Sequence, residues 1–187
     1  MPRLRRLTPD DAADLALIES AAWRVAYEGI LPARSLKKMT PAALRSQWSR
    51  RLRKRGSLRW GILLGPRVVG YCTAGFCRDN DMEHGFAGEI FELYVHPRLQ
   101  GRGLGWELME QTWSDLANHG FRWGVLWVLE DNAPAHRFYE RCGMHHDGKR
   151  RRIFHGGKKV WAIRYCRALN RFDPFADQGT LPVVSRR

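Results

Sequence analysis

The sequence predicts a single α+β domain, in which a mixed central sheet is flanked by about four helices. The chain has 187 residues, of which 44% are hydrophobic, so it can bury one core of ordinary size. Strand-like and helix-like segments follow one another without internal repeats, and the second half has the order strand, helix, strand, helix, strand, strand. We therefore expect a domain over residues 1–169 and a loose tail over residues 170–187, where no periodicity is found.

The first half of the chain is predicted to supply helices and a hairpin. Thr8 or Asp10 can cap a helix whose apolar residues recur at helical spacing. Gly65-Pro66 lies between two apolar runs, which predicts that these runs pair as a hairpin. The expected elements are a strand at 4–7, a helix at 12–22, an amphipathic helical region at 33–52 and strands at 58–64 and 68–76.

The second half is predicted to contain the most buried strands. An acidic loop at 78–84 leads into the apolar segment GEIFELYVHP, and Gly120 ends the helix that follows this segment. Asp131 or Asn132 can cap a shorter helix, which Gly143 ends. The expected strands lie at 88–97, 123–130, 146–154 and 159–167, the last two joined through Gly156-Gly157.

A bare and basic turn separates the segment GEIFELYVHP from its helix. The sequence HPRLQGRGLGWELM, residues 96–109, has glycines at alternate positions, namely Gly101, Gly103 and Gly105, together with Arg98 and Arg102. Backbone without side chains that leads into a helix N-terminus favours an anion, usually a phosphate, because free N–H groups and the positive end of the helix dipole converge there. The turn therefore predicts a phosphate site.

Two common phosphate sites are excluded by their spacing. A dinucleotide-binding fingerprint would need its third glycine at Trp106, and no acidic residue ends a second strand at the required distance. A Walker A loop would need an upstream glycine and a hydroxyl residue, and Gly157-Lys158-Lys159 has neither. The turn must therefore belong to another class of phosphate-binding site.

The turn resembles the acyl-CoA pyrophosphate loop, R/Q-x-x-G-x-G/A, of the GCN5-related N-acetyltransferase (GNAT) superfamily. A second motif of that superfamily, N-x-x-A-x-x-F-Y-x-x-x-G-F, follows at the usual interval, with Met144 in place of the final aromatic residue. The resemblance covers roughly residues 4–167. The matching residues are Arg98 or Gln100, Gly101 and Gly103 in the first motif, and Asn132, Ala135, Phe138, Tyr139 and Gly143 in the second.

The resemblance implies that acetyl-CoA is the acetyl donor, and it implies the donor's contacts. Backbone amides of the turn would wrap the pyrophosphate, while Arg98 or Arg102 would add charge-assisted hydrogen bonds. Pantetheine would lie like an added strand between two diverging parallel strands, 89–95 and 123–130, with Asn132 as a helix cap and a polar contact. The binding residues so implied are Leu93, Tyr94, Val95, Arg98, Gly101, Arg102, Gly103, Leu104, Gly105, Trp106, Asn132, Phe138 and Tyr139.

Acetyl transfer to an amine needs a neutral nucleophile, a stabilised oxyanion and a proton for the departing thiolate. The resemblance implies Tyr139 as the proton donor, with a packed core tyrosine as the alternative, and the Val95 N–H as the oxyanion donor. We expect Glu89 to be the base, with Glu92 or a chain of water molecules as alternatives. Strict alternation along the strand would put Glu89 and Glu92 on opposite faces, so that only one could face the cleft.

We expect the acceptor to be a small primary amine that is admitted beside the aromatic residues Trp23 and Tyr27. Core packing is the alternative for these two rings, and a protein N-terminus or a lysine side chain is the alternative acceptor. The loop that contains Asp79, Asp81 and Glu83 has few basic residues close in sequence. Its negative charge would therefore attract a cationic amine.

The net charge of +13 has a competing interpretation. A non-catalytic module of the same fold could bind nucleic acid or the ribosome through the basic segments 50–55 and 149–152 together with Trp60. The simpler interpretation is a solvated basic surface, and we expect no nucleic-acid partner. A homodimer is left open.

The remaining composition predicts a cytoplasmic protein without a metal site. The four cysteines form no CxxC pair, which is typical of reduced thiols, and the histidines have no metal-ligand spacing. No apolar run is long enough to span a membrane, and the basic N-terminus lacks the apolar run of a signal peptide.

Overall fold

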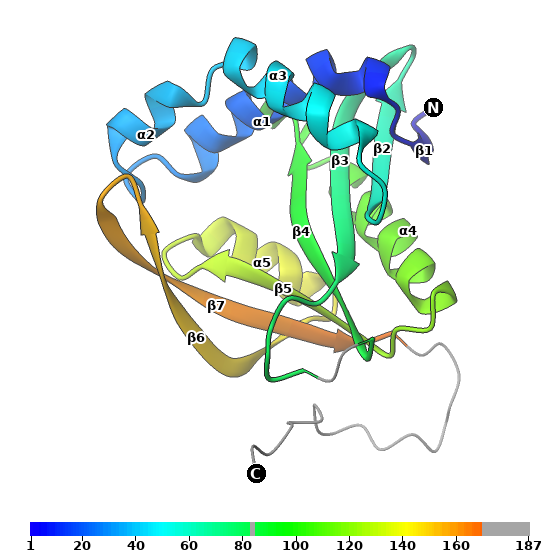
Figure 1. Ribbon diagram of the computed structural model, residues 1–187, viewed down its shortest axis with the longest axis vertical. Coiled ribbons are helices and arrows are strands. Elements are labelled where there is room, and N and C mark those ends of the chain that lie inside the picture. The colour runs from blue at the N-terminus through cyan, green and yellow to red at the C-terminus, as the bar shows by residue number, and fades with distance from the viewer. Residues whose placement is uncertain (83–84, 170–187) are drawn as a thin grey trace.

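The structure, a computed structural model, describes residues 1–82 and 85–169 (Figure 1). Seven strands form one sheet in the order β1-β2-β3-β4-β5-β7-β6, in which only β4 and β5 are parallel. The predicted α+β class is confirmed, and the predicted tail, residues 170–187, lies outside the described residues. The strands are β1 (Arg3–Arg6), β2 (Leu58–Leu64), β3 (Arg67–Phe76), β4 (Ala87–Val95), β5 (Trp123–Leu129), β6 (His145–His155) and β7 (Lys158–Ala168). The helices are α1 (Ala12–Ala26), α2 (Ala33–Lys38), α3 (Pro41–Arg53), α4 (Leu104–Asn118) and α5 (Ala133–Arg141).

The helical region predicted at 33–52 falls into two helices, α2 and α3. The break occurs at Thr40, whose backbone is extended, because a residue before proline disfavours the helical conformation. Pro41 then occupies the first position of α3, and the Thr40 hydroxyl accepts a hydrogen bond from the Ala43 N–H at 3.3 Å. The Thr40-Pro41 dipeptide therefore separates the two helices and starts α3.

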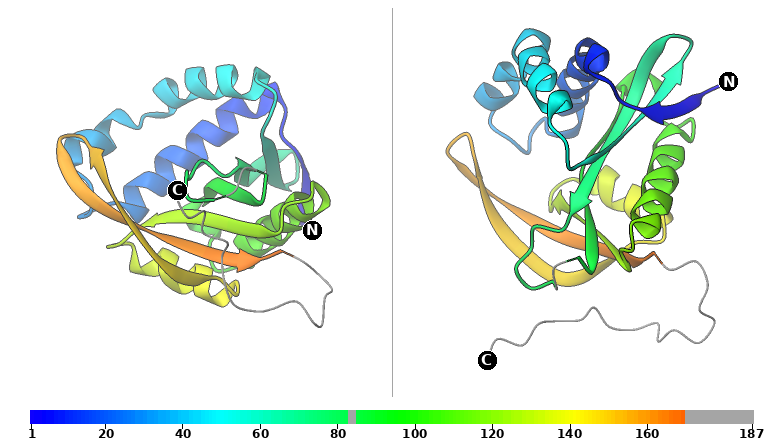
Figure 2. Two further views of the ribbon diagram at one scale, coloured as in Figure 1. Left: turned by 60° about the horizontal axis from the view of Figure 1, so that its bottom comes forward. Right: turned by 45° about the vertical axis from the view of Figure 1, so that its right-hand side comes forward.

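Helices cover both faces of the first part of the sheet. Tyr71 and Cys72 are neighbours on β3, so their side chains point to opposite faces. Tyr71 packs in a buried cluster with Ile18 of α1 and Trp48 of α3, whereas Cys72 packs in another cluster with residues of α4. Figure 2 shows the same arrangement, with α1 and α3 on one side of β2–β4 and α4 on the other.

The parallel strands β4 and β5 pair over only part of their length. Their register runs from Ala87 opposite Trp123 to Ile90 opposite Leu126, although β4 continues to Val95 and β5 to Leu129. Beyond Ile90 the two strands diverge, as Figure 1 shows. The predicted splayed parallel pair is confirmed.

The last two strands form a long hairpin whose tip lies against the segment around α2. The Arg34 Nε donates a hydrogen bond to the Gly156 carbonyl at 3.0 Å, and the Lys158 ammonium donates one to the Ile30 carbonyl at 2.8 Å. Because β7 pairs with β5 and β6 is the edge strand beside β7, these contacts connect the far edge of the sheet to the N-terminal helices. Among the described residues, no helix combines the length and apolar content needed to cross a membrane.

Candidate active site

The glycine turn has the backbone conformation that the sequence predicts for an anion site. Gly101 and Gly103 have φ of 76° and 79°, in the left-handed region that favours glycine, and no other atom lies near the place where a Cβ would stand. Gly103 is the N-cap of α4, so no side chain caps this helix. Within residues 1–82 and 85–169, the first N–H groups of α4 therefore have no hydrogen-bond partner, as an anion site requires.

The third glycine of the turn, Gly105, is required for helix packing rather than for backbone conformation. Gly105 lies inside the first turn of α4, and a Cβ there would stand 3.3 Å from the ring of Phe138. Its absence lets α5 pack closely against α4 at the point where the two acyl-CoA motifs meet. Arg98 and Arg102 are exposed and form no ion pair within the described part of the chain, so both can contact a phosphate.

The end of β4 has one backbone edge turned away from β5. Leu93, Tyr94 and Val95 pair with β3 but lie beyond the last residue of β4 that pairs with β5. The Gln100 side-chain amide donates to the Val95 carbonyl at 3.2 Å. The divergence thus leaves free strand edge beside the N-terminus of α4, which suits an extended ligand with amide groups.

Asn132 caps α5, as the sequence predicts. Its side-chain oxygen accepts a hydrogen bond from the Ala135 N–H at 3.3 Å, and the residue is buried. Its amide nitrogen donates to no partner within residues 1–82 and 85–169. The cap is therefore compatible with a further contact to pantetheine, which stays a prediction.

Tyr139 projects from α5, with its ring centroid 5.3 Å from that of Phe138 and 6.1 Å from that of Tyr165. Burial raises the pKa of its hydroxyl above the ordinary value of 10.0, and the nearby Tyr27 hydroxyl adds to this. The hydroxyl forms no hydrogen bond to any described residue, so it keeps its proton and has it available to donate. The ring also packs against the core, so the geometry accommodates both sequence-based interpretations.

Glu89 and Glu92 lie on the same face of the sheet, so the prediction of opposite faces is wrong. Thr73 pairs with Glu92, but Ala74 pairs with Ile90, which leaves Phe91 as an extra residue in a β-bulge. An extra residue reverses the alternation that follows it, so regular counting along the strand fails here.

The two carboxylates have different surroundings. Glu89 is 1% exposed and accepts three hydrogen bonds from Arg78, one from its backbone N–H at 3.0 Å and two from its guanidinium at 3.0 and 2.6 Å. Glu92 accepts from Arg51 at 2.5 Å and from the Thr73 hydroxyl at 3.0 Å. Glu89 lines the cavity described next, and Glu92 does not.

A cavity of about 210 Å³ lies between the end of α1, the strands β4 and β5, and the β6–β7 hairpin. The structure brings Glu89 together with Trp23 and Tyr27 in its wall, although Glu89 is far from the two rings in the sequence. The Trp23 and Tyr27 rings meet edge to face at 4.9 Å, and the Tyr27 and Tyr94 hydroxyls share a hydrogen bond at 3.2 Å. The two rings therefore line the cavity rather than a closed core.

The acidic loop is not free to attract a cation, which corrects the prediction for Asp79 and Asp81. The buried guanidinium of Arg164 binds Asp79 at 2.8 Å and Asp81 at 2.9 Å, and it also binds Asp147 at 2.7 Å. Arg164 lies far along the chain on β7, so nearness in sequence gave no sign of it. Glu83, the third acidic residue of this prediction, lies outside the described residues.

The cavity wall also contains side chains that sequence reasoning missed, among them Arg78, Trp127 and Arg151. The Arg78 guanidinium lies 4.3 Å from the Phe91 ring centroid, and the Arg151 guanidinium lies 4.0 Å from that of Trp127. Arg151 belongs to a basic run that predicts only a charged surface. Alternation along β6 could have signalled it, because Arg151 shares a face with Ile153 and His155, which also line the cavity.

The structure also describes the surroundings of the cysteines and of the side chains that could bind a metal. The four cysteines are free thiols, and burial raises the pKa of Cys72 to about 12 and of Cys77 to about 11. No cluster of histidine, cysteine and acidic residues in the described ranges could hold a metal ion.

The fold and the site define a class of protein. A splayed parallel strand pair beside an uncapped, glycine-led helix is the geometry of an acyl-CoA-binding transferase. The model of the acetyltransferase (GNAT) family matches residues 21–144. The chain belongs to this family, and it is an N-acetyltransferase with acetyl-CoA as its acetyl donor.

Known proteins are similar along most of the chain. The uncharacterized N-acetyltransferase YuaI of Bacillus subtilis is 26% identical over 144 residues, which are 75% of this chain and 78% of that protein. The probable N-acetyltransferase Rv2775 of Mycobacterium tuberculosis is 28% identical over 149 residues, 79% of this chain and 82% of that one. The PaiA N-acetyltransferase of Thermoplasma acidophilum, solved with coenzyme A, has the same fold with a TM-score of 0.67 and 16% identity, over 88% of this chain and 98% of that one.

Proposed function

We propose that this protein transfers the acetyl group of acetyl-CoA to a small primary amine by direct attack within a ternary complex. The observation that supports this proposal is the cavity of about 210 Å³ beside the divergence of β4 and β5. The β6–β7 hairpin closes one side of it through the Arg34–Gly156 and Lys158–Ile30 contacts. A cavity of this size suits a small molecule better than a polypeptide chain.

The residues present fit acetyl-CoA, which supplies an activated thioester when bound. The N–H groups at the start of α4 bind and orient the pyrophosphate, and Arg98 and Arg102 add charge-assisted hydrogen bonds. The free edge of β4 from Leu93 to Val95 aligns the pantetheine, and the Val95 N–H stabilises the developing oxyanion. Glu89 to Phe91 of the same strand line the acceptor cavity, which supports a meeting of donor and acceptor along β4.

In the proposed reaction the amine nitrogen bonds to the acetyl carbon while the carbon–sulfur bond breaks. One proton leaves the nitrogen, and one is delivered to the sulfur. Tyr139 holds the second proton on its unpaired hydroxyl. Glu89 takes the first, directly or through water, because it is the carboxylate in the cavity wall, and its three hydrogen bonds from Arg78 fix its orientation.

The proposal is tested by incubating the protein with acetyl-CoA and a panel of amines, with thiol release as the readout. We expect turnover with small primary amines and none with tertiary amines, which have no proton to lose. A Glu89→Gln variant should lose more activity than Glu92→Gln, because only Glu89 borders the cavity. Turnover restricted to peptide N-termini or lysine-containing peptides would replace the small-molecule acceptor with a protein.

Nucleic-acid binding in addition to acetyl transfer is the second candidate function, and one observation favours it. Phe154 and Trp161 are exposed on the outer face of the β6–β7 hairpin, where the Arg150 guanidinium lies 3.8 Å from the Trp161 ring centroid. The patch expected around Trp60 is less suitable, since that indole donates to Asp115 at 3.0 Å and lies under Arg6. Salt-dependent RNA binding without acetyl-CoA would support this second candidate.

A further inference from the structure

In the acceptor cavity most side chains that accept hydrogen bonds are engaged, whereas several donor groups bond to no described residue. This difference indicates the chemical class of the acceptor, and the inference rests on the proposed function. Two of the three cavity side chains that can accept a hydrogen bond are engaged within the described residues, and His155 is the exception. Both oxygens of Glu89 accept from Arg78, and the Tyr27 hydroxyl is bonded to that of Tyr94. A substrate that offered only an ammonium group would therefore find few free side-chain acceptors.

The donors of the same cavity are in surplus. The Arg151 guanidinium has one charged partner, Asp79, at 3.4 Å through Nη1, and its other nitrogens bond to no described residue. Arg78 uses Nε and Nη2 on Glu89, which leaves its Nη1 free among the described residues. The buried indole nitrogen of Trp23 also has no hydrogen-bond partner in that part of the chain.

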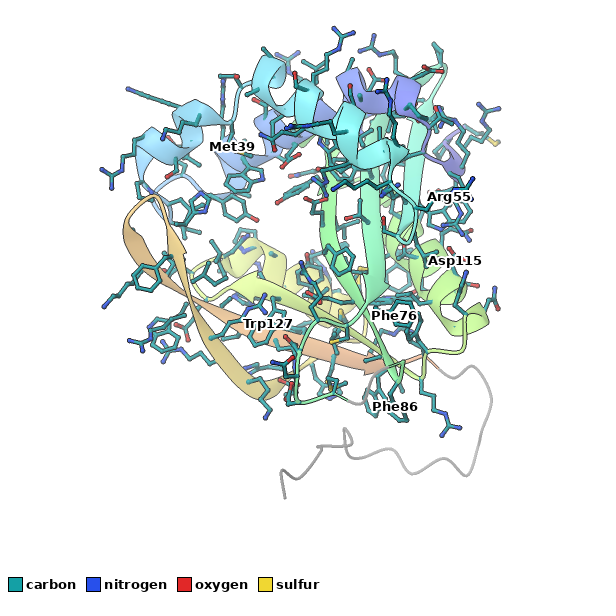
Figure 3. The ribbon with its side chains drawn as sticks, viewed as in Figure 1. Met39, Arg55, Phe76, Phe86, Asp115 and Trp127 are labelled. Atoms are coloured by element: carbon teal, nitrogen blue, oxygen red, sulfur yellow. The ribbon has the colours of Figure 1, made fainter. Side chains whose placement is uncertain are left out.

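Asp79 does not depend on Arg151 for its neutralisation. Its carboxylate accepts from Arg164 at 2.8 Å and from the Trp127 indole at 2.9 Å, both shorter than its 3.4 Å contact with Arg151. The Arg151 guanidinium is instead held against the Trp127 ring, which lies on the cavity side of β5 (Figure 3). Stacking fixes the plane of an arginine and leaves its N–H edges available for an oxyanion.

We propose that the acceptor bears a carboxylate in addition to its primary amine, and that Arg151 binds this carboxylate. The amine then faces Glu89 on β4, while the carboxylate meets the arginine on β6 across the same cavity. The rings of Trp23, Tyr27 and Trp127 enclose the apolar body between them. The substrate class is an amino acid or a close analogue with an apolar or aromatic side chain.

Matched acceptor pairs test this inference, because the members of each pair differ only in the carboxylate. Phenylalanine is compared with phenethylamine, and tyrosine with tyramine, by thiol release from acetyl-CoA. We expect kcat/KM to be about tenfold or more higher for the member with the carboxylate, as one charge-assisted bidentate contact would give. An Arg151→Gln variant should reduce this preference to near unity, chiefly by raising KM for that member.

The neighbouring residue supplies the control. Arg150 lies on the opposite face of β6, where it pairs with Glu130 at 2.6 Å, so Arg150→Gln should keep the preference. Arg151→Lys, which keeps the charge without the planar fork, should give an intermediate ratio and replaces the glutamine variant if that one does not fold. A preference for the amine without the carboxylate, or equal loss for both members in Arg151→Gln, would overturn the inference.

Failure of the inference and failure of the proposed function give different results. Turnover with polyamines or simple amines alone would refute the carboxylate and leave the acetyltransferase function intact. No turnover with any amine, in a protein that binds acetyl-CoA by calorimetry, would refute both.

Discussion

The two halves of the active site are built from different materials. The donor half consists of the glycine turn, the N-terminus of α4 and the end of β4, and it offers mainly backbone groups. The acceptor half is the cavity between α1, β4, β5 and the β6–β7 hairpin, and its wall consists of side chains that bind one another. The donor half therefore offers backbone N–H and C=O groups, and the acceptor half offers charged and aromatic side chains.

This difference explains why the sequence identified the acetyl donor, whereas the acceptor could only be inferred from the structure. A pyrophosphate is bound by N–H groups whose geometry follows from a few glycines in one short stretch. The proposed acceptor cavity is lined by residues from Trp23 to Ala162, and its charged side chains have partners elsewhere in the fold. Four substitutions test this difference between the two halves.

The charge network of the acceptor half should depend most on Arg164. This guanidinium is 1% exposed and binds three carboxylates. Within the described residues, Arg164→Met therefore leaves the Asp147 side chain, which is 5% exposed, without an ion pair, and the Asp79 side chain, which is 9% exposed, with only its 3.4 Å pair to Arg151. We expect the free energy of unfolding to fall by about 3–5 kcal/mol in urea denaturation. The control is Arg150→Met, whose exposed pair with Glu130 should contribute less than about 1 kcal/mol. Equal losses in the two variants would show that the network does not hold the acceptor half together.

Tyr139 lies where the two halves meet, so its hydroxyl should affect turnover without affecting donor binding. Tyr139→Phe keeps the ring and removes the proton donor, and we expect kcat to fall by about a hundredfold with unchanged affinity for acetyl-CoA by calorimetry. Tyr165→Phe is the matched control, since that hydroxyl is already bonded to Glu140 at 2.9 Å. Unaltered turnover in Tyr139→Phe would assign the residue to the core.

The donor half should be sensitive to backbone conformation at Gly103. A β-branched residue is strained at its φ of 79°, so Gly103→Val should displace the turn and weaken acetyl-CoA binding by roughly tenfold or more. Gly65→Val imposes a similar strain at φ 59° in the β2–β3 hairpin, where there is also open space. Calorimetry should show lost affinity only in the first variant. The same affinity in both would remove the turn from the binding site.

The smallest effect concerns a buried carboxylate behind the cavity, Glu19, which accepts a hydrogen bond from the Trp48 indole at 2.7 Å. Burial, assisted by the charge of Glu92, raises the pKa of Glu19 above its ordinary value of 4.5. The folded protein therefore binds the proton more tightly than the unfolded chain, and ionised Glu19 destabilises the fold above its folded pKa. Glu19→Gln should be more stable at neutral pH by about 1 kcal/mol, a common size for single substitutions.

That advantage should shrink as the pH falls through the folded pKa of Glu19 toward 4.5, because the wild-type side chain then becomes neutral too. Thermal unfolding of both proteins across this range measures the difference. A difference that grows on acidification would show that the carboxylate is stabilised in its charged form.

The sequence predicted most elements within a few residues, because apolar periodicity and glycine breaks are local signals. Its errors arose where a distant contact decided the outcome. The bulge at Phe91 put Glu89 and Glu92 on one face, and it depends on the register between β3 and β4. Likewise, the acidic loop seemed free because its partner, Arg164, follows Asp79 by 85 residues.

The sequence alone established the family and the acetyl donor, and it predicted the backbone that would bind this donor, because these depend on short motifs whose glycines and helix caps act over a few residues. Only the tertiary structure decided which carboxylate lines the cavity, which arginines keep spare donors and how the β6–β7 hairpin closes over them. Side-chain charge is neutralised through space, and its partners come from whichever strands the sheet brings together. The acceptor site is therefore a property of the fold, whereas the donor site is already present in the order of the residues.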